Sequence, residues 1–245
     1  QNLSALSDGL VGYWKMDETS WTNNCVATSV TDSSGNANNG SACPATTGPT
    51  GGAVGKFGNA GLFDGTDDYV SLATSTSLNI TNNITMTAWV KTSSTTGSVI
   101  IGGYNAGVDN TGYGLGYGQT VAGKISYWSQ AYGSWVTANS TINDNLWHHV
   151  AVSVSGTTAT FYKDGQIDGT ATTNIPNSYS GTRAIGARKD GLGPFAGSID
   201  DIRIYNRALS PAEVAQLYSW APGPVGYWNF EEGSGLSAKD SSGNG

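Results

Sequence analysis

Short segments with alternating side chains, separated by turns, recur along most of this chain. Residues 85–90, 149–154 and 199–205 each send neighbouring side chains to opposite faces, which is the pattern of a half-buried strand. Strict alternation in the last of these puts Asp200 on one face together with Ile202 and Ile204. Such segments follow one another at intervals of about 8–15 residues, with no amphipathic helices between them. The pattern predicts an all-β sandwich of two antiparallel sheets.

One helix is predicted near the end of the chain. Ser210 and Glu213 have the spacing of a capping box, with proline at the first helical position between them. Val214, Leu217 and Tyr218 then fall on one helical face. We expect this helix to dock on an edge of the sandwich.

The charge pattern excludes several kinds of partner. Charged residues make up 12% of the 245 residues, and the net charge is −7. The few basic side chains are spread singly, so no basic stripe is available to bind nucleic acid. No apolar run reaches the roughly 18–20 residues that membrane insertion requires. The many hydroxyl and amide side chains favour a secreted or cell-surface protein.

Two cysteines, Cys25 and Cys43, lie in polar, turn-rich sequence. They lack the short spacing and the neighbouring histidine of a zinc site. We therefore predict a disulfide between them, which indicates an oxidising, extracellular location.

The chain contains an internal repeat. Residues 11–18 reappear with small changes as residues 225–232, and residues 32–36 reappear as residues 240–244. The repeat predicts one full module over residues 9–221, followed by a linker and the truncated start of a second module over residues 222–245. A lone strand in the second copy cannot bury its aromatic side chains, so we expect either a continuing second module or self-association through residues 222–245.

Several motifs, taken together and in order, resemble the laminin G-like modules of the concanavalin A-like lectin/glucanase superfamily, as found in bacterial-type surface proteins. They lie at residues 11–18, 32–36, 63–70, 147–151, 161–165 and 197–210. The resemblance implies a jelly roll with one concave sheet, in which the final strand returns beside the first. Modules of this kind serve as lectins, adhesion units, enzyme appendages and spacers, so the fold alone does not fix the function.

The resemblance also implies a structural calcium ion that ties the first strand, an adjoining turn and the last strand together. Matched to this sequence, its ligands are Asp17, Asp64 and Asp200. Separately, Asp32, Ser34 and Asn36 have the spacing of the first three ligands of a calcium loop, although the closing glutamate is absent. The same residues also suit hydrogen-bonded Asx-turns without an ion.

An enzymatic function is disfavoured. The glucanases of this superfamily carry a Glu-x-Asp-x-Glu triplet, which this chain lacks, and the full module contains only Glu18 and Glu213. His148 and His149 are adjacent on a predicted strand, so they point to opposite faces and cannot bind one ion together. We expect one imidazole to pack between the sheets and the other to form hydrogen bonds at the surface, and we expect no glycoside hydrolase activity.

Aromatic side chains gather in the middle of the chain, where they suit either a sandwich core or a platform for sugar rings. The candidate ligand-binding residues are Tyr104, Tyr113, Tyr117, Trp128, Tyr132 and Trp135, with Arg188 as a hydrogen-bond donor. We predict a non-catalytic carbohydrate-binding or adhesion module whose partner is a glycan or a cell-surface protein. The alternative is a structural subunit of a surface assembly or filament. An aromatic cluster open at the concave face favours the first, and a face filled by its own loops favours the second.

Overall fold

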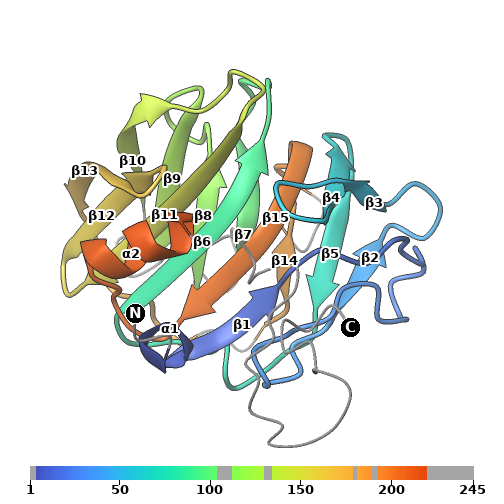
Figure 1. Cartoon of the computed structure of the whole chain (residues 1–245), viewed down its shortest axis with the longest axis horizontal. Helices are drawn as coiled ribbons and strands as arrows, with labels where there is room; N and C mark the ends of the chain where they lie inside the picture. The colour runs from blue at the N-terminus through green and yellow to red at the C-terminus, as the bar shows by residue number, and fades with distance from the viewer. Residues whose placement is uncertain (1–3, 104–111, 130–133, 179–180, 189–191, 220–245) are drawn as a thin grey trace, which may run out of the picture.

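The computed structural model describes residues 4–103, 112–129, 134–178, 181–188 and 192–219, which form two β-sheets stacked face to face (Figure 1). The eight-stranded sheet has the order β13-β12-β11-β6-β15-β4-β3, with β1 also paired to β15. The seven-stranded sheet has the order β10-β9-β8-β7-β14-β5-β2. All pairings between these strands are antiparallel, which confirms the predicted sandwich.

The elements have the following bounds. The eight-stranded sheet contains β1 (Leu10–Trp14), β3 (Thr50–Val54), β4 (Asn59–Asp64), β6 (Ile84–Lys91), β11 (Trp147–Ser155), β12 (Thr158–Lys163), β13 (Gln166–Thr172) and β15 (Ala196–Tyr205). The seven-stranded sheet contains β2 (Gly40–Cys43), β5 (Tyr69–Leu72), β7 (Ser98–Gly103), β8 (Tyr113–Tyr117), β9 (Lys124–Ser129), β10 (Ser134–Thr141) and β14 (Arg183–Ile185). Two helices complete the described fold, α1 (Ser4–Ser7) and α2 (Pro211–Ser219).

The last strand, β15, lies inside the eight-stranded sheet rather than at its edge. One side of β15 pairs with β6, and the other side is shared end to end by β4 and β1. The first strand of the module therefore lies beside the last, as the resemblance implied. The inward side chains of both sheets form one apolar core, to which β11 contributes Val150, Val152 and Val154.

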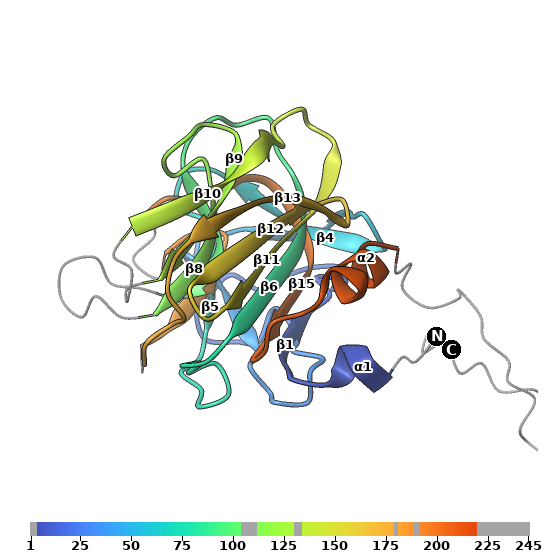
Figure 2. The ribbon, with the colours of Figure 1, turned by 90° about the vertical axis from the view of Figure 1, so that its left-hand side faces the viewer.

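Helix α2 begins with the predicted capping box. The backbone N–H of Ser210 donates to a Glu213 carboxylate oxygen at 2.8 Å, and the backbone N–H of Glu213 donates to the Ser210 hydroxyl at 3.3 Å. The expected position on a sandwich edge is wrong, because α2 covers the outer face of the eight-stranded sheet (Figure 2). That face is apolar here, and Val214 and Leu217 pack with Tyr205 in a second cluster. Among the described residues, no helix has the length and apolar character needed to span a membrane.

A β-bulge interrupts the alternation of β15. The pairing with β6 shifts between Asp200 and Arg203, and Asp201 adopts a positive φ of 49°. Asp200 therefore lies opposite Trp89, while Ile202 and Ile204 face the core. The prediction that Asp200 shares a face with the two isoleucines is wrong, because one extra residue in a strand reverses the phase of the side chains before it.

The loop that follows the first strand protects its free edge. One carboxylate oxygen of Asp32 accepts hydrogen bonds from the backbone N–H of Tyr13 and of Ser34, both at 2.9 Å. The other accepts from the Ser34 hydroxyl and from the backbone N–H of Asn38, both at 2.8 Å. Asn38 in turn donates to the Val11 carbonyl at 2.7 Å. Both Asp32 oxygens are occupied by donors of the chain itself, so the loop is built by Asx-type turn chemistry.

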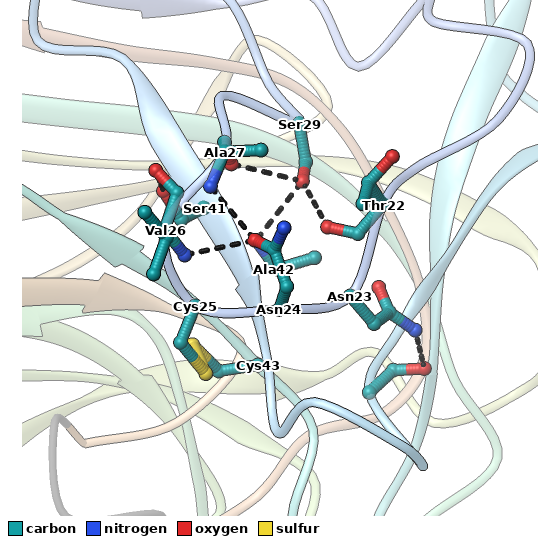
Figure 3. The surroundings of a disulfide bond; sticks show 11 residues. Thr22, Asn23, Asn24, Cys25, Val26, Ala27, Ser29, Ser41, Ala42 and Cys43 are labelled. Carbon is teal, nitrogen blue, oxygen red and sulfur yellow. Dashed lines mark hydrogen bonds between the residues drawn. A yellow bond between two sulfur atoms is a disulfide. The ribbon is translucent and has the colours of Figure 1, made fainter.

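Cys25 and Cys43 form the predicted disulfide, with their Cα atoms 5.0 Å apart (Figure 3). The bridge joins the end of β2 to the long loop before it, and the backbone N–H of Cys25 donates to the Ala42 carbonyl at 3.1 Å. The neighbouring Val26 is 84% exposed. The disulfide therefore fastens a surface loop to a strand and lies outside the main core.

Candidate functional site

A row of small and aromatic residues crosses the outer face of the seven-stranded sheet. Strand register places Trp135 of β10 beside Trp128 of β9, then Gly114 of β8 and Gly102 of β7. The residues next to them in each strand, such as Tyr127, turn inward to the core. The outer face therefore carries two indole rings followed by glycines, of which Gly102 and Gly114 are themselves buried.

The two indole rings lie against each other, with centroids 6.4 Å apart and planes tilted by 42°. The ring of Trp135 also lies over β8, because a Cβ atom added to Gly116 would come within 2.6 Å of its Cζ3. A side chain at position 116 would therefore have to displace this ring. Trp135 is half-buried, whereas Trp128 is 7% exposed and packs against Val99.

This sheet differs in charge from the rest of the chain. The seven strands as described contain no aspartate or glutamate, although the whole chain has 18 such residues. Hydrogen-bonding groups near the tryptophans come from Ser126, which pairs with Gly116, and from Gln119, whose amide donates to the Ser98 carbonyl at 2.7 Å. Arg188 is half-buried, in a turn where its backbone N–H donates to the Leu192 carbonyl.

The predicted aromatic residues fall into two groups. Trp128 and Trp135 are brought together on the outer face. Tyr113 and Tyr117 do share one face of β8, but that face is the core, where both are fully buried. Their hydroxyl groups donate to the backbone carbonyls of Leu78 and Ser94, and burial raises the pKa of both phenols, that of Tyr117 to about 12.

These two tyrosines therefore lie outside the candidate surface. Tyr104 and Tyr132 lie outside the described residues. The glycines of this surface were not among the predicted site residues, although the alternation of glycine with large side chains in residues 113–117 was the available signal.

A second candidate site surrounds the turn between β3 and β4. One carboxylate oxygen of Asp200 accepts the backbone N–H groups of Lys56 and Phe57, at 2.9 and 3.0 Å. Asp17, just after β1, accepts the backbone N–H of Asn59 at 3.1 Å. The chain just after the first strand and the last strand thus meet at two carboxylates, as the resemblance implied, but the turn beside them is the one between β3 and β4.

The residues of this turn site fit a hard cation. Asp200 is 1% exposed, and its Oδ1 is buried without a hydrogen-bond partner. Burial, reinforced by the neighbouring carboxylates of Asp201 and Asp17, raises the pKa of Asp200 to about 8, although backbone N–H donors oppose the shift. A bound cation satisfies such an oxygen and restores the charged carboxylate.

Asp64 does not join Asp17 and Asp200. It lies at the far end of β4 from the turn, and six strand residues span roughly 17–20 Å. Asp64 instead clusters with Asp67 and Asp68 in the loop from β4 to β5. Asp67 and Asp68 were not among the predicted ligands.

The two histidines point to opposite faces, as expected. His149 is buried beside Trp89 with ring centroids 5.4 Å apart, and burial, with a smaller contribution from Arg203, lowers its pKa to about 3. His148 lies between two carboxylates, with its Nδ1 2.8 Å from Asp164 and its Nε2 3.1 Å from Asp144. Each imidazole thus has a packing or hydrogen-bonding role.

Three solved structures show the same fold at low sequence identity. Domain 4 of AbnA, a GH43 extracellular arabinanase from Geobacillus stearothermophilus, solved in complex with arabinotriose, matches with a TM-score of 0.65 and 23% identity, over 85% of this chain and 98% of that one. The binding domain of Paraclostridial Mosquitocidal Protein 1 matches with a TM-score of 0.63 and 17% identity, over 87% of this chain. The ligand binding domain of botulinum neurotoxin serotype D, in complex with N-acetylneuraminic acid, matches with a TM-score of 0.58 and 15% identity, over 88% of this chain. This chain spans about half of each toxin domain, 52% in both cases.

The family comparison agrees with the fold. Residues 64–215, more than half of the chain, match the Laminin_G_3 model, and this region includes both tryptophans of the candidate surface. Together with the two antiparallel sheets and the pairing of the first strand with the last, this match shows that the chain belongs to the Laminin_G_3 family of the concanavalin A-like lectin/glucanases superfamily.

Proposed function

We propose that this protein is a non-catalytic carbohydrate-binding or adhesion module that acts outside the cell. The observation that carries the proposal is the Trp128–Trp135 pair beside a glycine strip on the outer face of the seven-stranded sheet. Indole rings provide the apolar face that a sugar ring stacks on, and the ring of Trp135 is only half-buried, so part of it is open to a ligand. The disulfide supports an extracellular location.

The solved relatives support the same ligand class. The arabinanase domain was solved with arabinotriose, and the neurotoxin domain with N-acetylneuraminic acid. These structures resemble this chain in fold alone. We therefore propose a glycan as the ligand and do not specify which sugar it contains. The absence of carboxylates from the strands of the seven-stranded sheet suits neutral and acidic glycans alike.

A hydrolytic role has little support in the described residues. Glu213 is engaged in the helix cap and in an ion pair with Arg207 at 2.7 Å, which holds its pKa at about 2. Glu18 accepts a backbone N–H from Thr31 at 2.8 Å. Neither glutamate belongs to the seven-stranded sheet, where the candidate surface lies.

A structural subunit without a small ligand is the second candidate function. The observation in its favour is that Trp128 and Val99, both on the outer face, are 7% and 1% exposed, so part of this face is already covered. Self-association through residues 222–245 belongs with this alternative. Those residues lie outside the described structure, and this proposal, like the second module, stays a prediction.

The glycan proposal predicts that Trp135→Ala weakens binding roughly 30-fold, because truncation of an aromatic anchor in an interface costs about 2 kcal/mol or more. Binding is measured on a glycan array that includes arabino-oligosaccharides and sialylated glycans, and then by titration of the best ligand. Tyr218→Ala, which removes a partly exposed aromatic side chain of helix α2 on the far side of the sandwich, is the matched control and should bind normally. A wild-type protein that binds nothing on the array would favour the structural subunit.

We further propose that calcium binds at the turn between β3 and β4, where Asp17 and Asp200 would hold it. The ion would supply positive charge to two carboxylates and lock the first and last strands to the turn. It would stabilise the module and take no part in any reaction.

Calcium at a hundredfold excess over its dissociation constant is expected to stabilise the protein by about 2.7 kcal/mol. For a chain of this size, such a gain raises the melting temperature by roughly 5–10 °C. Asp200→Asn should reduce the increase, and magnesium should reproduce little of it. If a chelator leaves the melting temperature unchanged and elemental analysis finds no metal, the proposal fails.

A further inference from the structure

Three aspartates gather in the loop that carries the chain from one sheet to the other. The loop joins β4 of the eight-stranded sheet to β5 of the seven-stranded sheet. One carboxylate oxygen from each of Asp64, Asp67 and Asp68 lies within 4.8 Å of the other two. Asp64 is exposed, Asp67 is half-buried and Asp68 is buried.

No ion pair balances this group within the described residues. The pairs found there involve Arg203, Arg207 and His148, and none of them includes an aspartate of the loop. Three carboxylates at this separation repel one another, and the repulsion grows as one of them leaves solvent. The chain has few charged residues, so such a concentration of one sign is unusual in it.

Asp68 supplies an independent sign of a ligand. Its residue is 2% exposed, and one carboxylate oxygen accepts the backbone N–H of Asp64 at 2.8 Å. The other, Oδ1, is buried and has no hydrogen-bond partner. Buried carboxylate oxygens are normally satisfied by donors or by a metal ion, and no donor of the described chain fills this position.

Turn chemistry explains only part of the cluster. The backbone N–H of Thr66 donates to Asp64 Oδ1 at 2.7 Å, which is an ordinary Asx-turn. Thr47 Oγ1 donates to Asp67 at 3.3 Å, and so connects the loop between β2 and β3 to this one. Neither contact accounts for the unpartnered oxygen of Asp68.

We propose that the loop of residues 64–68 binds a second divalent cation, held by the carboxylates of Asp64, Asp67 and Asp68. The donors are all hard oxygens, which favours calcium over the transition metals. Both loops that meet here, residues 44–49 and residues 65–68, connect the two sheets. The ion fastens these crossovers together at a place separate from the turn that holds Asp17 and Asp200.

The test counts bound ions by flow dialysis and by calorimetric titration with calcium chloride. The wild-type protein should bind two ions, and Asp67→Asn and Asp200→Asn should bind one each. Asp67 is only half-buried, so its substitution should leave the fold intact, which near-ultraviolet circular dichroism verifies. Asp8→Asn removes an equal charge from an exposed side chain elsewhere and should still bind two ions.

The outcomes separate this inference from the calcium proposal above. If the wild type binds one ion, which Asp200→Asn loses and Asp67→Asn keeps, the second site does not exist and the first stands. If one ion is lost in Asp67→Asn and kept in Asp200→Asn, the loop site stands and the turn site falls. A wild-type protein that binds no calcium overturns both.

Discussion

Asp32→Ala is expected to lower the free energy of unfolding by about 4 kcal/mol, because four hydrogen bonds to one buried carboxylate disappear together. Three of the donors are the backbone N–H groups of Tyr13, Ser34 and Asn38, and Asn38 is 2% exposed, so water cannot readily replace the lost acceptor. The damage should spread to β1, whose free edge this loop protects.

Equilibrium unfolding in urea measures the loss caused by Asp32→Ala. Asp32→Asn keeps one acceptor oxygen and should give an intermediate value. Ser33→Ala changes the next residue, which is exposed, and should unfold like the wild type within about 0.5 kcal/mol. A loss below about 1 kcal/mol for Asp32→Ala would show that the loop does not hold the strand.

Arg203→Met is the second substitution from which we expect a large loss, about 3–5 kcal/mol. The guanidinium of Arg203 lies 3.1 Å from the carboxylate of Asp201, donates to the Tyr13 hydroxyl at 3.0 Å and lies over the Tyr13 ring. Burial opposes its charge, but Asp201 and Tyr13 outweigh burial and raise the pKa of Arg203. Both Arg203 and Asp201 are almost fully buried, so removal of the cation leaves an uncompensated carboxylate.

A double substitution checks this explanation. Asp201→Asn combined with Arg203→Met should cost less than Arg203→Met alone, because no unpaired charge then remains. Tyr13→Phe removes only the hydroxyl contact and should cost about 1 kcal/mol. All variants are compared at one calcium concentration, because Asp201 adjoins Asp200. If the double variant is as unstable as the sum of the single ones, the pair does not act as a unit.

The sequence predicted the parts of this fold that rest on local chemistry. Alternation marked the strands, Ser210 and Glu213 marked the start of α2, and the two cysteines marked the disulfide. The strand and helix signals depend on residues close together in the chain. The disulfide signal depends on each of the two cysteines having only the other as a possible partner. The meeting of Asp17 with Asp200 followed from the family resemblance, which carries the long-range order of strands.

The failures have different physical causes, and the first is that alternation does not say which face of a strand is buried. Tyr113 and Tyr117 share a face as predicted, but only the second sheet shows that this face is the core. The bulge at Asp201 gave no sequence signal, because a residue other than glycine adopts the positive φ there. Asp64 was placed with Asp200 by the family resemblance, which does not show that the length of β4 separates Asp64 from the turn beside Asp200.

The internal position of β15 has a consequence for how the module is made. A ribosome delivers the chain from its N-terminus, so β1 and β4 emerge long before the strand that joins them to β6. Arg203 follows its partner Tyr13 by 190 residues in the chain. Until β15 is synthesised, β1 and β4 cannot pair with it, and the eight-stranded sheet is not continuous. In a tandem array, a second copy of the opening strand emerges about 20 residues after β15, a span of a few seconds at ordinary rates of synthesis. Correct pairing within one module therefore depends on β15 closing on its own first strand within that interval.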